Sequence, residues 1–287
     1  MKSFQYLRPE RLSEAISIME GFGSGARPLL GGTDLMVRIQ KGQTDPDAVV
    51  DLKRVRDIEA TIGVDAGKIT VGARMVLSDL VRHADIQEHY PALVEAASVV
   101  GSIQIRNRAT LVGNICNASP AADTVPPLMA YSASILVAKA GGRQEVSLEK
   151  FFLGPGKTVC GPTELVVAVQ IPVPRQPFGC AFGRLTRRRG VDLAIINMAC
   201  AIDADGITTF AFGAAAPTII IARDETGELA RADLPESQRD ELLQSLIDKT
   251  SPISDVRSGG EYRRAMLLTI GRRVLWQAQQ RRRARAG

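Results

Sequence analysis

The stretch TLVGNICNASPAADTVPPLM, residues 110–129, pairs a Gly-Asn dipeptide with a small loop that carries a single carboxylate, Asp123. Gly113 allows the backbone to approach a ligand without hindrance from a Cβ atom, and the Asn114 side chain can both donate and accept hydrogen bonds. Such a segment is compatible with a turn whose backbone amides face a bulky anion, and also with a tight loop without a ligand. A carboxylate has the wrong charge for a phosphate, so Asp123 suits either sugar hydroxyls or an Asx-turn in its own loop.

A second glycine segment, LLGGTDLM, occupies residues 29–36. Gly31 and Gly32 interrupt an apolar run, and the exposed amides of such a turn form a nest that favours phosphate oxygens. The alternative is a strand-to-helix turn with Asp34 as the helix N-cap. The segment is neither G-x-G-x-x-G nor a P-loop. Together the two segments predict a clamp that holds a dinucleotide diphosphate without a Rossmann motif, with Asp123 beside a polyol.

The hydrophobic pattern along the chain mixes helices and strands without a regular βαβ alternation, which predicts an α+β fold rather than a Rossmann fold. Hairpins are expected over residues 61–73, turning at Asp65-Ala66-Gly67, and over residues 132–148. Three prolines at positions 172, 174 and 177 predict a domain boundary. Beyond them the pattern predicts three strands, at 179–188, 193–203 and 207–218, and a final helix around 262–278.

Composition excludes several classes of protein. The chain of 287 residues is long enough for two domains, with 45% hydrophobic and 23% charged residues. Its net charge of +5 includes four arginines in the terminal run RRRARAG, which we expect to be a frayed, solvated end rather than a nucleic-acid arm. The four cysteines form no C-x-x-C pair, so neither a zinc nor an iron–sulfur site is predicted, and Cys200 is expected to be an inert core thiol. No signal peptide or membrane span is visible, which predicts a cytoplasmic protein.

LLGGTDLM together with GSIQIRNRATLVGNICNASPAADTVPPL closely resembles the FAD-binding (medium) subunit of the molybdenum hydroxylases, a family that includes xanthine dehydrogenase and carbon monoxide dehydrogenase. The segments FFLGPGKT, AFGAAAPT and SDVRSGGEYRRAML are also similar to family segments, and the bacterial xanthine dehydrogenase subunit is the most similar. The resemblance implies an FAD-binding domain of the vanillyl-alcohol-oxidase (PCMH) type over residues 1–175, with subdomains at about 1–60 and 61–175. It implies a C-terminal domain of the carbon monoxide dehydrogenase flavoprotein type over residues 176–287, with a three-stranded antiparallel sheet and helices.

The resemblance also implies which residues bind FAD. The two motifs would contact the diphosphate, Asp123 would hold the sugar hydroxyls, Val100 and Val166 would line the flavin-side pocket, and Arg184 would lie near the isoalloxazine. The full implied set is Leu29, Leu30, Gly31, Gly32, Thr33, Asp34, Leu35, Met36, Val100, Thr110, Leu111, Val112, Gly113, Asn114, Asp123, Val166 and Arg184. No catalytic acid or base and no metal ligand is predicted. The two histidines, His83 and His89, lie outside the flavin motifs, so non-covalent FAD is expected.

In the family, a large subunit hydroxylates the substrate at a molybdopterin centre, and electrons pass through two 2Fe–2S clusters of a small subunit to FAD and then to NAD⁺ or another acceptor. The resemblance therefore implies an electron-transfer subunit with these two partner chains, in which the flavin performs the redox chemistry. Two alternatives stay open. One is a self-sufficient FAD-dependent oxidase or dehydrogenase, which needs a general base that the motifs do not offer. The other is a nucleotide-binding structural subunit without a redox role.

Overall fold

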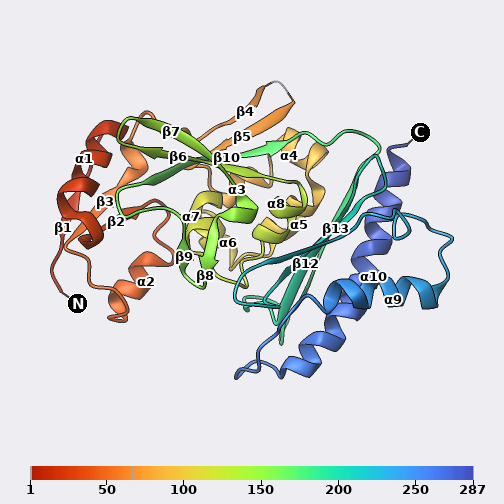
Figure 1. Cartoon of the computed structure of the whole chain (residues 1–287). Helices are drawn as coiled ribbons and strands as arrows, with labels where there is room; N and C mark the ends of the chain where they lie inside the picture. The colour runs from red at the N-terminus through yellow and green to blue at the C-terminus, as the bar shows by residue number, and fades with distance from the viewer. Residues whose placement is uncertain (1, 66, 287) are drawn as a thin grey trace.

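The computed structural model describes residues 2–65 and 67–286, and three sheets of three or more strands follow one another along the molecule (Figure 1). The sheets occur in the same order in space as in the sequence, from the N-terminal sheet to the sheet beside the C-terminal helix. Among the described residues, no helix combines the length and the apolar character needed to cross a membrane.

The N-terminal sheet is parallel, with strand order β1-β3-β2, and consists of β1 (Gln5–Leu7), β2 (Ala26–Leu29) and β3 (Ala48–Asp51). The crossovers contain α1 (Leu12–Phe22) with η1 (Gly23–Gly25), and α2 (Leu35–Gln40); η2 (Leu52–Arg54) follows β3. One face of α1 is buried because its apolar residues recur every three to four positions. Since β2 ends at Leu29, the first glycine segment starts at the carboxyl end of this parallel sheet, where ligands commonly bind.

The central sheet is antiparallel, with strand order β4-β5-β10-β6-β7: β4 (Ile62–Asp65), β5 (Lys68–Gly72), β6 (Ser134–Lys139), β7 (Gly142–Ser147) and β10 (Leu165–Pro172). Both predicted hairpins are confirmed, although Ala66 in the tip of the first lies outside the described residues. Between β5 and β6 come α3 (Leu77–Leu80), α4 (Ala84–His89), α5 (Pro91–Ser98), α6 (Ile103–Arg106), α7 (Leu111–Cys116) and α8 (Val125–Ala130). A small hairpin, β8 (Phe152–Gly154) and β9 (Lys157–Thr158), follows η3 (Leu148–Lys150).

The C-terminal sheet is antiparallel with helices, as expected, but it has four strands rather than the three that we predicted: β11 (Gly179–Leu185), β12 (Ile196–Ile202), β13 (Thr208–Gly213) and β14 (Ile220–Asp224). We missed β14 because its short apolar run follows a proline and a chain reversal at Ala214, which has a positive φ of 54°. Two helices, α9 (Glu236–Ile247) and α10 (Gly260–Ala284), complete the fold.

The two faces of the C-terminal sheet pack against different parts of the chain. Side chains such as Met198, Phe210 and Phe212 form a core with α9 and α10, and Cys200 belongs to this core as predicted. On the other face, small residues including Ala199 allow α5 and α8 to pack closely against the strands. The N-terminal part of the chain therefore contacts the C-terminal sheet directly, without an intervening layer.

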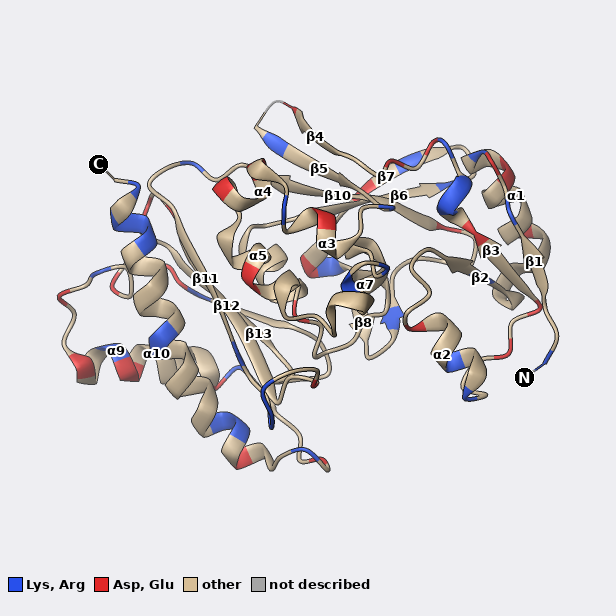
Figure 2. Ribbon diagram, turned by 180° about the vertical axis from the view of Figure 1, so that it is seen from behind, with Lys and Arg blue, Asp and Glu red and all other residues tan. Residues whose placement is uncertain are grey.

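The prediction of a frayed, solvated C-terminal tail is wrong. Helix α10 continues to Ala284, and its last turns carry the arginines that Figure 2 shows as blue bands near the C-terminus. Arg281 pairs with Glu95 on α5 and donates to the carbonyl of Cys180, while Arg282 donates to the carbonyl of Asp203 at 2.9 Å. These arginines hold α10 against the rest of the fold because each finds an acceptor that is distant in sequence.

Candidate functional site

The structure brings the first glycine segment into contact with Arg108 and Ala109, the two residues directly before the second glycine segment. A Cβ atom added to Gly31 would overlap the carbonyl oxygen of Arg108 and would lie 2.8 Å from its carbonyl carbon and 3.0 Å from the Cα of Ala109. The second segment is fixed in turn to the loop before α3, because Leu77 N donates to Ala109 O at 2.9 Å. Two stretches that are almost 80 positions apart in the sequence thus form one site, and Gly31 is the point of closest approach.

The first glycine segment presents a run of free backbone amides. Gly32 has a φ of 73°, a conformation that favours glycine, and its carbonyl accepts from Met36 N at 3.2 Å as the chain enters α2. Within residues 2–65 and 67–286, none accepts a hydrogen bond from the amides of residues 31–35. Asp34 precedes α2, but its side chain does not cap the helix. Consecutive free amides in a turn bind phosphate oxygens, so this segment fits a diphosphate.

The second glycine segment differs from the predicted Gly-Asn turn, because residues 111–116 form the helix α7. Thr110 is its N-cap: Thr110 Oγ1 accepts from Gly113 N at 2.9 Å, and Thr110 O accepts from Asn114 N at 3.0 Å. The side chain of Asn114 also has a partner, since its Oδ1 accepts from Thr124 Oγ1 at 2.7 Å. The second segment therefore offers an anion fewer free amides than we predicted.

Asp123 is 8% exposed and binds two side chains of the C-terminal sheet. Its Oδ2 accepts from Arg184 Nη1 at 2.6 Å, and its Oδ1 accepts from Asn197 Nδ2 at 2.8 Å. Burial raises the pKa of the Asp123 carboxyl to about 6, although Arg184 and Asn197 both act to lower it. The Asx-turn alternative does not describe this site, because both oxygen atoms bind residues on other elements. Each carboxylate oxygen has a further lone pair, so Asp123 can still accept from a ligand.

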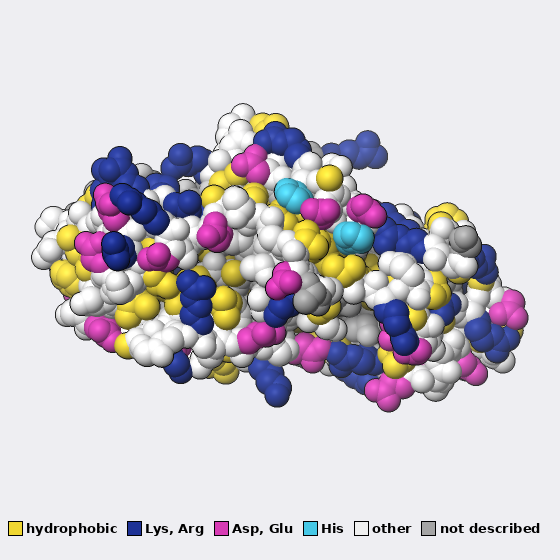
Figure 3. Space-filling view, turned by 90° about the horizontal axis from the view of Figure 1, so that it is seen from above, with side chains coloured by type: hydrophobic (Ala, Val, Ile, Leu, Met, Phe, Trp, Pro, Cys, Tyr) yellow, Lys and Arg dark blue, Asp and Glu magenta, His cyan; other side chains and the backbone are white. Residues whose placement is uncertain are grey.

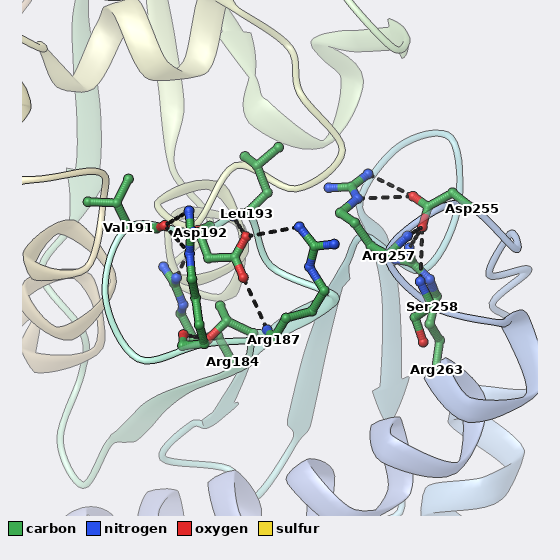
Figure 4. Close-up of polar contacts among 11 residues, drawn as sticks. Arg184, Arg187, Val191, Asp192, Leu193, Asp255, Arg257, Ser258 and Arg263 are labelled. Carbon is green, nitrogen blue, oxygen red and sulfur yellow. Dashed lines mark hydrogen bonds and ion pairs between the residues drawn. The ribbon is translucent and has the colours of Figure 1, made fainter.

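Arg184 joins Asp123 to the segment before α6. Its Nη1 also donates to Val99 O at 3.0 Å. Its Nη2 donates to the backbone oxygen of Asp192 at 3.0 Å, and both residues are labelled in Figure 4. Arg106 donates to Val100 O at 3.1 Å and thereby holds the neighbouring peptide. The structure thus brings Asp123, Arg184 and the carbonyl of Val99, which directly precedes Val100, together from three separate segments of the chain. Val166 lies buried in β10, the strand against which α7 packs.

Asn197 is a site residue that the sequence analysis missed. It is fully buried, and its side chain holds Asp123 from β12. A signal was present, because Asn197 is the one amide in the otherwise apolar run LAIINMACAI, at residues 193–202. A polar group in a buried strand needs a hydrogen-bond partner, so this position pointed to a specific polar contact.

A separate cavity lies elsewhere in the molecule. Its volume is about 440 Å³, and its lining includes Tyr131, Phe178, Arg175 and Asp203 but none of the predicted site residues. It lies where β12 ends and β13 begins, at the far end of these strands from Asn197. Among the described residues, no cluster of three or more His, Cys, Asp or Glu side chains could hold a metal ion. The candidate site is therefore assigned from the two contacting segments and from Asp123, and this cavity is not part of it.

Residues 2–174 match the family described as the FAD binding domain in molybdopterin dehydrogenase. The chain belongs to this family. Residues 181–278 match the CO dehydrogenase flavoprotein C-terminal domain. Both the recognised family and the expected fold class are therefore confirmed, and the protein is an FAD-binding oxidoreductase subunit.

Relatives match over nearly the whole chain. The xanthine dehydrogenase FAD-binding subunit of Escherichia coli O157:H7 is 28% identical over 278 residues, 95% of each chain. The carbon monoxide dehydrogenase medium chain of Hydrogenophaga pseudoflava is 27% identical over 276 residues, which covers 95% of this chain and 96% of the relative. A chain in the structure of reconstituted CO dehydrogenase from Oligotropha carboxidovorans superposes with a TM-score of 0.88 at 26% identity, covering 98% of this chain and 99% of that one.

Proposed function

We propose that this chain is the electron-transfer subunit of a molybdenum hydroxylase complex similar to xanthine dehydrogenase. In this proposal, electrons from 2Fe–2S clusters of a small partner subunit pass through FAD to NAD⁺ or another acceptor, and a large subunit holds the molybdenum cofactor. The contact between the two glycine segments, with the free amides of residues 31–35, is the observation that carries the proposal. FAD, when bound, would accept and release the electrons.

The residues of this chain would bind and orient FAD. The amides of residues 31–35 would hold the diphosphate, with Leu29, Leu30, Met36 and residues 110–114 around it. Asp123 would accept hydrogen bonds from the sugar hydroxyls through the lone pairs that Arg184 and Asn197 leave unused. Val100 and Val166 would line the flavin-side pocket, and Arg184 would lie close to the isoalloxazine. In these assignments the protein contributes binding and orientation, and no residue acts as a catalytic acid or base.

The relatives support the proposed partners and division of the chain. Their names describe an FAD-binding subunit and a medium chain, which are components of larger assemblies. The spans of the two family matches, 2–174 and 181–278, support domains at residues 1–175 and 176–287. The proposed subdomains at about 1–60 and 61–175 are supported by the separate sheets, because β3 ends at Asp51 and β4 begins at Ile62. A cytoplasmic location stays a prediction.

The purified chain should carry tightly bound, non-covalent FAD. The two histidines, cyan in Figure 3, are His83, which directly precedes α4, and His89, the last residue of α4. Each lies beside an acidic residue, and neither belongs to the glycine segments. Acid precipitation should release FAD into the supernatant. Colour that stays with the pellet would contradict the non-covalent assignment, and recovery of FMN alone would contradict a diphosphate site.

Electron transfer is tested by dye reduction with the FAD-loaded chain alone and then with its two partner chains. The chain alone should pass electrons from a small reductant, such as NADH, to a dye. It should not oxidise purines, aldehydes, carbon monoxide or N-heterocycles until both partners are added. Bleaching of the flavin by one of these substrates without partners would favour the self-sufficient oxidase. Bound FAD that no reductant reduces would favour the structural subunit.

The affinity for FAD should fall as the pH is lowered through about 6, because the neutral Asp123 carboxyl accepts hydrogen bonds less strongly than the carboxylate. Uptake of one proton limits the effect to about tenfold in Kd per pH unit. Titration of the apoprotein with FAD between pH 5 and 8 measures it, and Asp123→Asn should bind more weakly with no such pH dependence. A wild-type Kd that is constant over this range would contradict the role of Asp123.

The same raised pKa predicts how the stability of the apoprotein depends on pH. Lowering the pH should stabilise the apoprotein, although it weakens FAD binding. The folded pKa of about 6 exceeds the usual value of 3.8, so the folded state binds the proton more tightly than the unfolded state does. This group therefore stabilises the apoprotein at low pH, and its contribution is lost as the pH rises from about 4 through 6. Comparison of the pH dependence of unfolding for wild type and Asp123→Asn isolates the contribution.

A further inference from the structure

Three residues form a row across the C-terminal sheet, on the face that packs against Asp123. Arg184 on β11 is directly opposite Asn197 on β12, and Asn197 is directly opposite Gly213 on β13. Residues paired in this way point to the same face of an antiparallel sheet. Arg184 and Asn197 each bind one oxygen of the Asp123 carboxylate, so adjacent positions in the row fix its orientation.

The loop that carries Asp123 is bound to the same strands through its backbone. Asn197 Nδ2 donates to Ala121 O at 3.3 Å as well as to Asp123. Ala214 N, which directly follows β13, donates to Pro120 O at 2.7 Å. Asp123 therefore lies in a loop of the N-terminal half of the chain, but residues of the C-terminal sheet determine where the carboxylate is and how it is turned.

Gly213 provides the space that Asn197 occupies. A Cβ atom at position 213 would overlap Asn197 Oδ1 and lie 3.0 Å from its Cγ. The φ angle of Gly213 is not in the left-handed region, so glycine is required here for room and not for backbone conformation. Asn197 Oδ1 is buried and accepts no hydrogen bond from a described residue, so the side chain is held through its nitrogen atom alone. Any group at position 213 would push directly on this side chain.

We propose that Asn197 and Gly213 are positioning residues of the FAD site: Gly213 leaves the space in which Asn197 turns the Asp123 carboxylate toward the sugar hydroxyls. This inference rests on the proposed function, since it needs FAD to be the ligand of Asp123. It adds that the C-terminal sheet completes a cofactor site whose glycine segments both lie in the N-terminal half. Neither residue needs to touch FAD, because each acts through its neighbour in the row.

A double-mutant cycle on the full-length chain tests the proposal, with the FAD Kd and the thermal midpoint of the apoprotein measured for each variant. Asn197→Ala should weaken FAD binding by about tenfold or more, the scale for one hydrogen bond to a charged group. Gly213→Ala should weaken it to a similar extent by displacing Asn197. In the double variant the overlap with Asn197 is gone, and the remaining close neighbour of the alanine at 213 is the end of the Ile219 side chain, at 3.2 Å, which can move. The Kd of the double variant should therefore equal that of Asn197→Ala, and the two effects should not add.

Gly271→Ala is the matched control, because the nearest atom to its added Cβ is Phe210 Cε1 at 4.0 Å, an ordinary contact in the same domain. Its FAD Kd should equal that of the wild type. If Gly213→Ala fails to fold, the Asn197→Ala variant and the double variant still test whether Asn197 positions Asp123. They should fold, and both should bind FAD about tenfold or more weakly than the wild type.

A pH profile separates positioning from simple packing. Burial raises the pKa of Asp123, and Arg184 on β11 and Asn197 on β12 act to lower it, so loss of the Asn197 amide should raise the pH at which FAD binding weakens. A packing defect alone would lower the thermal midpoint and leave this pH unchanged. Three outcomes would overturn this inference and leave the proposed function standing. They are additive effects in the cycle, an unchanged pH profile in Asn197→Ala, and wild-type FAD affinity in either single variant. A wild-type chain that binds no FAD overturns the proposed function as well.

Discussion

Replacing Gly31 by alanine is expected to deprive the protein of FAD and to lower its free energy of unfolding by about 2–3 kcal/mol, near the upper end for overpacking a dense site. The added Cβ would overlap Arg108 O and would lie 2.8 Å and 3.0 Å from Arg108 C and Ala109 Cα. All three are backbone atoms, so no side-chain rotation can relieve the overlap. The two glycine segments would have to separate, and the free amides of residues 31–35 would move away from the diphosphate.

The measurement is FAD content after purification, together with chemical denaturation of the apoprotein. Gly21→Ala is the matched control because its Cβ has no neighbour within 4 Å. It lies inside α1, so alanine there should be neutral or stabilising by up to about 1 kcal/mol, with full FAD content. If Gly31→Ala also retains full FAD content, the contact between the segments does not position the amides and the proposed diphosphate site is wrong.

Substitution of the other glycines in the two segments should reduce FAD content less than Gly31→Ala does. The size of each loss depends on the atoms that the new side chain would meet. Gly32→Val adds strain because of the φ of 73°, but its nearest neighbour is the movable Leu29 side chain at 3.1 Å. Gly113→Val approaches only Thr110 Oγ1, at 3.0 Å, and so should weaken the α7 cap more than the fold. Both variants should give soluble protein that contains less FAD than the wild type.

Local sequence patterns predicted the features that depend on neighbouring residues. The first glycine segment follows a strand and precedes a helix, and the two hairpins lie where the apolar pattern placed them. The start of α7 was within reach of the same reasoning, since Thr110 before an apolar run is a typical N-cap.

The features that the sequence did not predict depend on residues far apart in the chain. The two partners of Asp123 are 61 and 74 positions away, and no spacing rule connects them. The terminal arginines were interpreted as solvated because nothing near them in sequence pairs with them, yet Arg281 reaches Glu95, 186 positions away. The direct contact of α8 with β12 and β13 brings Asp123, just before α8, into reach of the C-terminal sheet.

Replacing Asp123 by alanine is expected to weaken FAD binding by about 1.5–3 kcal/mol, the scale for a hydrogen bond to a charged group. The structure adds a second effect that the sequence did not predict. Arg184 is 12% exposed and would lose its ion-pair partner, which costs about 3 kcal/mol or more for a buried pair. Asn197 would keep Ala121 O as its only acceptor. A domain with typical stability should stay folded at 25 °C after this loss but should unfold at a lower temperature.

Circular dichroism at 25 °C should therefore be unchanged for Asp123→Ala, while the thermal midpoint and the FAD affinity both fall. Asp123→Asn should lose less stability, because an amide of the same shape still accepts from Arg184 through one oxygen. Asp205→Ala is the matched control: its carboxylate pairs with Arg175 at 2.5 Å, but both side chains are about 70% exposed, and such surface pairs contribute about 0–1 kcal/mol. An Asp123→Ala protein with wild-type FAD affinity and a lowered thermal midpoint would make Asp123 a purely structural ion-pair partner, and the sugar contact would then have to come from another residue.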